Sequence, residues 1–322
     1  MTGGAGFIGS HLVAQLLSRG ECVTVIDNLS TGRLSNLDDL PRDNLTIINA
    51  KVGQAINNLD PAQFHSIYHL AAAVGVRLVV EDPIHTIHTN VLETSAILEF
   101  ASSASTPILI ASTSEVYGKS TKTPFNEKDD VTYGPPSQTR FAYACSKSID
   151  EHLALAHNRE HDLPVVIARF FNIVGPRQVG QYGMVLPRFV SAALGDKKIE
   201  VYGDGRQTRC FCDVRDVVKL LPTLLDNPKC LGEVFNIGND EQIEIGELAK
   251  LVCKTLSSQS EIAYIPYDVA FGPDFDDLKN RQPDLSHLQN ATGFRATTPL
   301  TQTINDLAKQ IKCKRSSAES LA

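Results

Sequence analysis

The sequence predicts an α/β fold in which a doubly wound parallel sheet carries a smaller α/β lobe that is discontinuous in sequence. Three observations predict it: a glycine-rich turn that runs into an amphipathic helix, apolar strands that alternate with amphipathic helices, and proline- and glycine-punctuated loops after residue 172. Strands that are apolar throughout are typical of parallel sheets covered by helices on both faces. We expect right-handed connections between them.

The first element, residues 1–20, has the form of a phosphate-binding turn that leads into a helix. Gly3, Gly6 and Gly9 are spaced three apart, and apolar residues then recur at the helical period up to Gly20, a plausible C-cap. A diphosphate reaches backbone N–H groups at a helix N-terminus only where no Cβ stands in the way, so glycine is chemically required there. The alternative interpretation of the triplet alone is an ordinary glycine-rich turn.

The next segment strengthens the first interpretation. Residues 21–27 form a β-type run that ends in Asp27, a carboxylate about 20 residues on from the glycines, as dinucleotide binding requires. Asp27 would accept hydrogen bonds from the adenosine ribose hydroxyls, and no basic residue follows until Arg33, which favours NAD over NADP. A strand-end acid facing water is the alternative for Asp27.

One feature departs from the dinucleotide-binding pattern. The turn normally follows a buried apolar strand at the centre of the sheet, whereas Met1 stands directly before Thr2 and Gly3. Either the start codon is assigned too late and a short apolar strand is missing, or the chain folds without that strand and is correspondingly weakened. Intact-mass measurement on protein from the native source decides between the two hypotheses.

Apolar strands and amphipathic helices then alternate along the chain. We expect strands at residues 45–49, 66–70, 107–111, 164–168 and 234–237, and helices at 86–101, 186–194 and 245–256. Small side chains follow the strand that ends at Leu70, and Ala71 and Ala72 would let the backbone approach a cofactor.

The domains follow from the change in character at residue 172. Residues 1–172 and 210–240 are expected to form the domain with the parallel sheet. The smaller lobe is expected to comprise residues 173–209 and 241–313. The polar residues 314–322 are interpreted as a mobile tail.

Composition and charge exclude several classes of function. The 322 residues are 42% hydrophobic and 21% charged, as in a globular protein of one or two domains, and the net charge of −7 argues against nucleic acid as the main partner. No apolar run is long enough to span a bilayer and no signal-peptide pattern is seen, so we expect no membrane partner. Seven cysteines, an odd number without a Cys-x-x-Cys pair, fit reduced thiols in the cytoplasm.

No metal site is expected. His65 and His69 are four apart, but a strand boundary intervenes and no carboxylate joins them. Cys210 and Cys212 lie two apart on a predicted strand and are interpreted as small packing residues rather than metal ligands.

Two clusters carry groups suited to acid–base chemistry. Thr113, Ser114 and Glu115 follow the strand at 107–111, which places them at the carboxyl edge of the sheet, where doubly wound folds bind ligands; a strand-end cap is the alternative. Tyr143 and Lys147 are four apart and therefore share one helix face. The ammonium would lower the tyrosine pKa toward neutrality and make the phenol a usable base, although Tyr-x-x-x-Lys alone is common by chance.

Together these motifs resemble the extended short-chain dehydrogenase/reductases that act on nucleotide sugars, whose cofactor domain is a Rossmann fold. The resemblance covers almost the entire chain and rests on Thr2-Gly-Gly-Ala-Gly-Phe-Ile-Gly9, Asp27-Asn28, the Thr113 segment, Tyr143-x-x-x-Lys147 and Arg169-Phe-Phe-Asn172. It implies a bound NAD that is reduced and reoxidised within one turnover, so that no net redox change appears. It assigns NAD contacts to Gly3, Gly6, Phe7, Ile8, Gly9, Asp27, Asn28, Leu70, Ala71, Ala72, Tyr143 and Lys147.

The resemblance also implies roles for single residues. Tyr143 would be the base on the sugar 4-hydroxyl, Lys147 its electrostatic partner and a ribose contact, and Thr113 a hydrogen-bond partner of the same oxygen. Nucleotide-sugar binding would fall to the smaller lobe and to Ser114, Asn172, Arg188, Arg209 and Arg281. For each arginine the alternative is a solvated surface charge. A homodimer paired through the helices around 86–101 and 142–157 is implied as well.

The residues after Thr113 distinguish the reactions of the family. Sugar 4,6-dehydratases usually carry Thr-Asp-Glu where this chain has Thr113-Ser114-Glu115, so the acid is absent and dehydration is disfavoured; 4-epimerases usually have no carboxylate at the Glu115 position. Residues 112–118, Ser-Thr-Ser-Glu-Val-Tyr-Gly, look most like the UDP-glucuronate decarboxylases, or UDP-xylose synthases.

The resemblance therefore implies a lyase that decarboxylates UDP-glucuronate through a 4-keto intermediate, with Glu115 among the catalytic residues. The alternative is an isomerase, a 4-epimerase of UDP-glucose or UDP-glucuronate. A non-catalytic NAD-binding protein on the same scaffold is a third hypothesis, which the intact Thr113, Tyr143 and Lys147 argue against.

Overall fold

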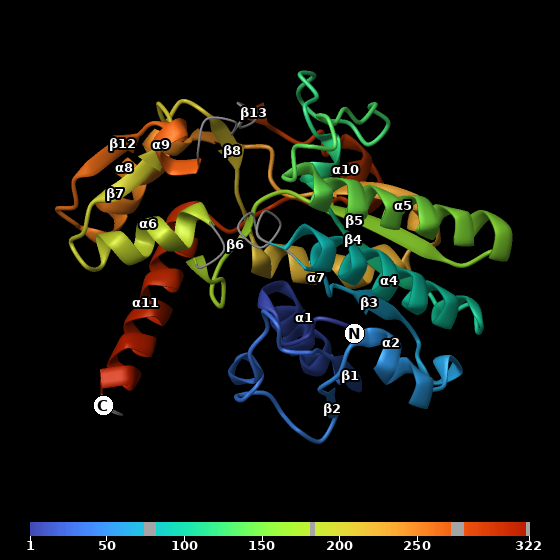
Figure 1. Ribbon diagram of the computed structural model, residues 1–322. Coiled ribbons are helices and arrows are strands. Elements are labelled where there is room, and N and C mark those ends of the chain that lie inside the picture. Colours follow the sequence, from blue (N-terminus) through green and yellow to red (C-terminus); the bar gives the residue numbers. More distant parts are fainter. Residues whose placement is uncertain (74–81, 181–183, 272–279, 320–322) are drawn as a thin grey trace.

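The computed structural model describes residues 1–73, 82–180, 184–271 and 280–319. A parallel sheet with helices on both faces forms one side of the molecule, and a smaller α/β lobe forms the other (Figure 1). The predicted fold class, an α/β protein with a Rossmann-like parallel sheet, is confirmed.

The strands of the large sheet pair in parallel throughout. Their order is β2 (Leu45–Ile48), β1 (Val23–Ile26), β3 (Ile67–His69), β4 (Ile108–Thr113), β5 (Val165–Phe170) and β10 (Glu233–Ile237), with Thr2 joining β1 to β3 through single bridges to Ile26 and His69. The Thr2 N–H donates to the Tyr68 carbonyl at 3.0 Å, and the Gly3 N–H donates to the Ile26 carbonyl at 2.8 Å. The glycine-rich turn therefore leaves from the middle of the sheet.

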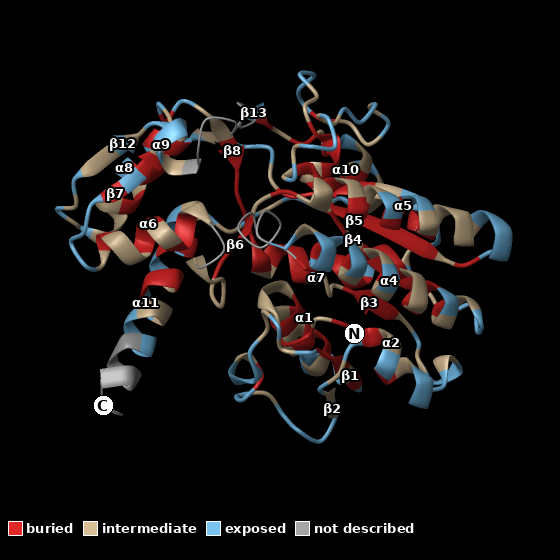
Figure 2. Ribbon diagram, viewed as in Figure 1, coloured by how far each residue is buried: buried red, intermediate tan, exposed pale blue. Residues whose placement is uncertain are grey.

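Helices cover the two faces of this sheet. Helices α1 (Phe7–Ser18) and α7 (Val214–Asp226) share a core cluster with Leu109, whereas α2 (Val52–Ala55), α4 (Pro83–Ser102) and α5 (Phe141–His161) share another with Ile108 and Ile110. Neighbouring residues of a strand face opposite sides, so a strand covered on both faces is apolar throughout, as β4 is. Figure 2 shows β4 and β5 buried between the two layers.

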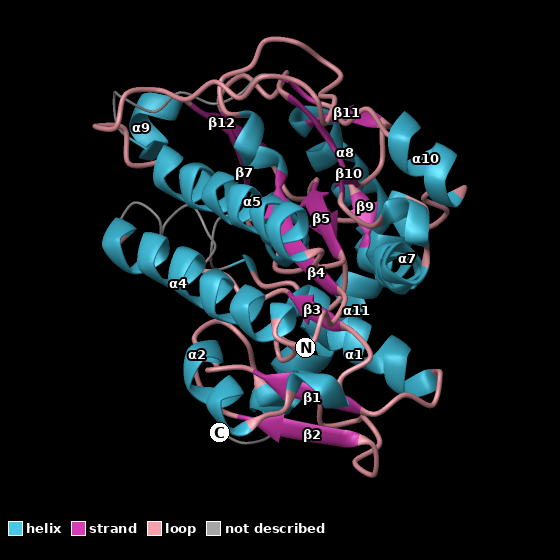
Figure 3. Ribbon diagram, turned by 90° about the vertical axis from the view of Figure 1, so that its right-hand side faces the viewer, coloured by secondary structure: helices cyan, strands magenta, loops and turns pink. Residues whose placement is uncertain are grey.

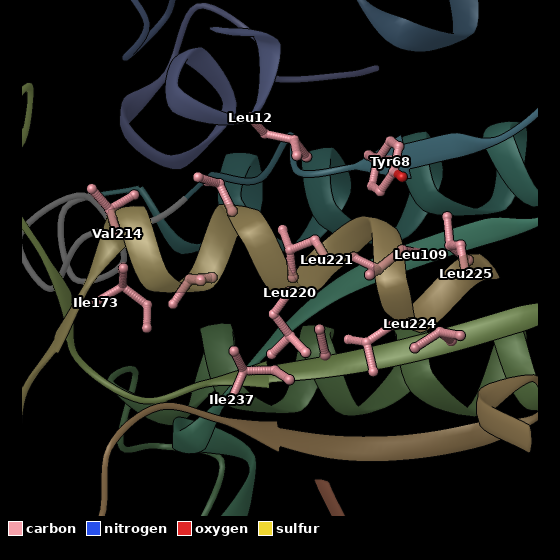
Figure 4. Packing of buried hydrophobic residues seen from close by; sticks show 14 of the residues in the cluster. Leu12, Tyr68, Leu109, Ile173, Val214, Leu220, Leu221, Leu224, Leu225 and Ile237 are labelled. Carbon is pink, nitrogen blue, oxygen red and sulfur yellow. The ribbon is translucent and has the colours of Figure 1, made fainter. Parts of the chain in front are cut away.

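The α7 helix supplies much of the first core cluster. Leu220, Leu221, Leu224 and Leu225 point from it toward the sheet, where they meet residues such as Leu109 (Figure 4). Burying side chains of this size contributes about 1.5–3 kcal/mol each to folding.

The smaller lobe has a core of its own. Its strands are β7 (Ile199–Tyr202) paired in parallel with β12 (Ile262–Ile265), and β8 (Thr208–Cys210) between antiparallel β11 (Gln242–Glu244) and parallel β13 (Asn280–Arg281). Its helices are α6 (Val185–Ala193), α8 (Ile245–Leu256), α9 (Tyr267–Phe271) and α11 (Leu300–Glu319). A separate cluster of buried residues joins α6, α8, α11 and β7.

Short elements connect the two parts. Strands β6 (Ile173–Val174) and β9 (Cys212–Asp213) pair in parallel between the sheet and the lobe, and α10 (Ser286–Thr292) packs against β10. Residues 314–319 were predicted to belong to a mobile tail. They instead form the last turns of helix α11, which continues through Glu319. Residues 320–322 lie outside the described residues.

The structure also reports on the expected absences. Within the described part of the chain, no group of three or more His, Cys, Asp or Glu residues is placed to hold a metal ion. His69 is instead buried between the Thr2 and Thr94 hydroxyls, and Cys210 and Cys212 are buried packing residues. Of the helices described, none is both long and apolar enough to cross a membrane.

Candidate active site

A cleft of about 1080 Å³ lies between the carboxyl edge of the sheet and the smaller lobe. Every site residue predicted from the sequence lines this cleft except Lys147. From the sheet side the lining includes Gly3, Gly6, Phe7, Ile8, Gly9, Asp27, Asn28, Leu70, Ala71, Ala72, Thr113, Ser114, Glu115 and Tyr143. From the region beyond residue 170 it includes Asn172, Arg188, Arg209 and Arg281.

The glycine-rich turn is shaped for close approach of backbone to a ligand. Gly3 has a φ of +71°, and a Cβ on it would lie 2.7 Å from the Ala71 backbone nitrogen. A Cβ on Gly9 would collide with the Gly3 carbonyl. Helix α1 begins at Phe7 without a side-chain cap, so N–H groups of its first turn are left for a ligand. This cradle fits the diphosphate of a dinucleotide.

Asp27 is held at the end of β1 by two backbone donors. Its Oδ2 accepts from the Ala5 N–H at 2.9 Å, and its Oδ1 accepts from the Leu29 N–H at 2.8 Å. The side chain is buried and lines the cleft, so it does not face bulk water. Its position fits the ribose contact that the sequence predicts. The exposed Arg33 also lines this end of the cleft.

Thr113 and Glu115 lie where β4 turns into a short 3₁₀ helix, Ser114–Tyr117. The Thr113 hydroxyl caps this turn by accepting from the Glu115 N–H at 3.2 Å. The Glu115 carboxylate forms an ion pair with Arg281, a buried residue of β13. This pair joins the sheet edge to the smaller lobe across 166 positions of sequence.

Tyr143 lies on α5 and lines the cleft. Burial is the main cause that raises its pKa, the Glu115 carboxylate raises it further, and a hydrogen bond with Thr113 opposes both. The expected lowering toward neutrality is therefore not what the structure shows.

Besides burial and Glu115, the Asp150 partner of Lys147 contributes to this difference. Lys147 Nζ donates to Asp150 Oδ2 at 2.6 Å, and the two side chains are only 1% and 0% exposed. The carboxylate compensates the ammonium charge that was expected to stabilise the phenolate. Lys147 is thus buried behind the cleft wall rather than placed on it.

The predicted substrate-binding residues gather at the lobe end of the cleft. The Arg188 guanidinium stacks on the Tyr202 ring at 4.1 Å and donates to the Glu200 carbonyl at 2.8 Å. Arg209 and Arg281 are buried, so the alternative of a solvated surface charge does not apply to them. Asn172 donates to the Cys210 carbonyl at 3.2 Å.

Sequence reasoning missed two groups at or behind the site. Arg177 lines the cleft with a buried Nη1 that has no hydrogen-bond partner, and burial lowers its pKa. An anionic ligand group would satisfy that nitrogen, so this observation also fits a phosphate-bearing occupant. The signal available in the sequence was its place directly after Gly175 and Pro176 at the sheet edge. Asp150 was missed too, although its spacing from Lys147 is that of a helical ion pair.

Comparison with known proteins gives consistent results. The sequence model of the "NAD dependent epimerase/dehydratase family" matches residues 1–238. The UDP-N-acetyl-alpha-D-glucosaminuronate decarboxylase of Bacillus cytotoxicus is 39% identical over 95% of this chain and 95% of that protein. UDP-glucuronic acid decarboxylase 1 of Danio rerio is 34% identical over 95% of this chain and 70% of that protein. The Thermus thermophilus UDP-glucose 4-epimerase, solved in complex with NAD, superposes with a TM-score of 0.81 at 26% identity over 97% of each chain.

Proposed function

Because this chain belongs to the NAD dependent epimerase/dehydratase family, we propose that it is an NAD-dependent lyase that decarboxylates a UDP-linked hexuronate. The reaction is redox-neutral and passes through a 4-keto intermediate. The observation that carries this proposal is the placement of Thr113, Glu115 and Tyr143 on one wall of the cleft, with Arg281 paired to the Glu115 carboxylate. The named relatives support it, since both decarboxylate a UDP-linked uronate.

The turn at Gly3, Gly6 and Gly9 and the buried Asp27 are the residues that would hold NAD. The turn offers N–H groups to the diphosphate and Asp27 accepts from the adenosine ribose. Held there, NAD would supply a hydride acceptor and donor for C4 of the sugar within one turnover.

Tyr143 and Thr113 handle the proton of the sugar 4-hydroxyl. Tyr143, in its ionised form, takes that proton. The Thr113 hydroxyl, which is hydrogen-bonded to Tyr143, orients the same sugar oxygen. The ketone formed at C4 is β to the C5 carboxylate. The C5–C6 bond then breaks, and its electron pair is delocalised into the C4 carbonyl as carbon dioxide leaves. The resulting enolate takes a proton at C5.

Glu115, Ser114 and the nearby arginines serve the carboxyl end of the substrate. Glu115 and Ser114 line the cleft beside Thr113 and are positioned to manage the proton that replaces the carboxyl group. Arg281 fixes the Glu115 carboxylate, and with Arg209 it brings positive charge to an anionic substrate. A 4-epimerase needs no group for proton delivery to C5, so Glu115 favours decarboxylation.

The test is to incubate the purified protein with NAD and, separately, UDP-glucuronate, UDP-N-acetylglucosaminuronate and UDP-glucose, and to weigh the products by mass spectrometry. We expect one of the two uronates to lose the mass of carbon dioxide. The two uronates differ at C2, so their relative rates identify the preferred substrate. An unchanged mass with a new sugar stereocentre would contradict decarboxylation and support the 4-epimerase alternative.

We also propose that two copies pair through α4 and α5, which run side by side on the outer surface of the sheet (Figure 3). Ile84, Ile87 and Leu92 of α4 and Ile149 of α5 are large apolar residues exposed to solvent, Ile84 to 68% and Leu92 to 62%. A second copy would bury this surface. Light scattering on the wild type and on Leu92→Glu tests the pairing.

The cysteines are all free thiols, which supports a cytoplasmic location.

A further inference from the structure

A buried ion pair lies directly behind the candidate base. Tyr143, Lys147 and Asp150 follow one another at spacings of four and three on α5, which places them along one face of the helix. Lys147 Nζ donates to Asp150 Oδ2 at 2.6 Å, and neither side chain is more than 1% exposed. At this depth the charges are poorly screened, so each one matters to its neighbours.

The other acids around Tyr143 already have partners. Glu115 pairs with Arg281 at the cleft wall. Glu151, the residue after Asp150, accepts from Arg169 Nε at 2.9 Å and from Arg169 Nη2 at 2.7 Å. Among the described residues, Asp150 is therefore the carboxylate left to compensate Lys147.

Among the described residues, two side chains from α4 and β3 lie behind the pair. Thr94 of α4 reaches Asp150 with its hydroxyl and is 3.1 Å from Nε2 of His69 on β3. Burial lowers the pKa of His69 to about 3, and the nearby Lys147 ammonium lowers it as well, so His69 is neutral at physiological pH. In the described part of the chain, Lys147 and Asp150 are therefore the ion pair directly behind Tyr143.

The consequence concerns the proton that Tyr143 carries. A lone ammonium one turn away would draw the phenol toward ionisation, whereas an ammonium in contact with a carboxylate presents only a dipole. We propose that Asp150 is a positioning residue that acts through Lys147: by neutralising the ammonium, it makes Tyr143 hold its proton more tightly than Lys147 alone would allow. This inference rests on the proposed function, in which Tyr143 is the base for the sugar hydroxyl.

Tight retention of the proton by Tyr143 is useful in a redox-neutral reaction. A proton must be given to the C4 oxygen when the ketone is reduced, after the carboxyl group has left. A phenol that loses this proton to solvent has none to give back when C4 is reduced. The Lys147–Asp150 pair therefore suits an enzyme that restores the hydroxyl it has oxidised.

The test is Asp150→Asn, which removes the charge and keeps the shape. In the NAD-loaded enzyme, we expect the acidic limb of the kcat–pH profile to move to lower pH by about one unit or more. Removing a negative charge lowers the pH at which the Tyr143–Lys147 pair loses its first proton, whichever of the two groups gives it up. Lys147→Met should move the limb the other way.

A second readout does not depend on turnover. The ultraviolet difference spectrum between each protein and its Tyr143→Phe version isolates the ionisation of that phenol. The midpoint of this titration should move to lower pH in Asp150→Asn, because the Tyr143 phenolate then lies near an uncompensated Lys147 ammonium. The matched control is Glu151→Gln, which removes the neighbouring buried carboxylate and breaks its bonds to Arg169. That variant should lose stability without moving the acidic limb.

The outcomes separate this inference from the proposed function. Turnover that survives Tyr143→Phe would refute the base and with it the mechanism. Turnover abolished in Tyr143→Phe, with the acidic limb unmoved in Asp150→Asn, would refute the role of Asp150 alone. If Asp150→Asn does not fold, Lys147→Met is compared with Lys147→Met/Asp150→Leu, which buries no charge. Equal midpoints of Tyr143 ionisation in these two variants support the action of Asp150 through Lys147. A lower midpoint in the double variant contradicts it.

Discussion

The two ends of the cleft use different kinds of chemical group. At the cofactor end, the Gly3–Gly9 turn presents backbone N–H groups, and Asp27 is itself fixed by backbone donors. At the catalytic end, side chains held in charged pairs do the work: Glu115 with Arg281, and Lys147 with Asp150 behind Tyr143. NAD binding at the cofactor end should therefore be sensitive to added side-chain atoms. Catalysis at the other end should be sensitive to the addition or removal of a single charge.

Tyr143→Phe should have the largest effect and act on the catalytic end alone. Loss of the hydroxyl removes the group that takes the sugar proton, so kcat should fall by about 10²- to 10⁴-fold. Affinity for NAD, measured by calorimetry, should stay close to that of the wild type, since backbone groups bind the diphosphate. A loss of NAD affinity as large as the loss of turnover would break the proposed separation of the two ends.

Gly9→Ala should act on the cofactor end. The new Cβ would collide with the Gly3 carbonyl, so the turn must open and its N–H groups lose their alignment. We expect NAD affinity to fall about a hundredfold, which corresponds to about 2.7 kcal/mol.

Gly20→Ala is the matched control for that substitution, because a Cβ there meets nothing within 4 Å although φ is +81°. It should cost about 1–2 kcal/mol of stability through backbone strain and leave NAD affinity intact. Equal effects of the two alanines on NAD binding would show that strain, and not the shape of the turn, governs the cofactor end.

His69→Gln probes the place where the two ends meet, and its effect should be smallest. Nδ1 of His69 lies 2.8 Å from the Thr2 hydroxyl beside the glycine turn, and Nε2 lies 3.1 Å from Thr94 behind Asp150. Burial lowers the pKa of His69 from 6.5 to about 3. Between those values the unfolded chain binds a proton that the folded chain does not, so stability falls as pH falls, by about 1.4 kcal/mol per pH unit.

Urea unfolding of wild type and His69→Gln over this pH range measures that slope. The variant should be less stable near neutral pH, because two buried hydrogen bonds change, and its stability should depend less on pH. Parallel curves for the two proteins would show that His69 is not held neutral in the fold.

The same contrast explains what sequence reasoning could predict. Strands β1, β3, β4 and β5 and the Gly3–Gly9 turn depend on local patterns of apolar residues and glycine spacing, and the structure has them where they were expected. Motif matching also brought Thr113, Glu115 and Tyr143 to one cleft. These features follow from residues close in sequence or from motifs read jointly.

What was missed depends on packing between distant segments. Arg281 pairs with Glu115 across 166 positions, and no local pattern carries that information. The pKa of Tyr143 was expected to fall because the burial of Tyr143 was not visible in the sequence and Lys147 was read without its partner. The spacing from Lys147 to Asp150 was visible, but the burial of the pair depends on how α4 packs on α5. No helix was predicted over residues 214–226, because Pro222 interrupts the pattern of α7.

The most direct test of the central claim is to run the reaction on the preferred UDP-linked uronate in heavy water and to locate deuterium in the product. The account predicts a pentose with one deuterium at C5, where a solvent-derived proton replaces the carboxyl group. C4 should carry none, because its hydrogen leaves and returns as hydride within one turnover. Deuterium at C4, or a hexuronate of unchanged carbon count, would contradict it.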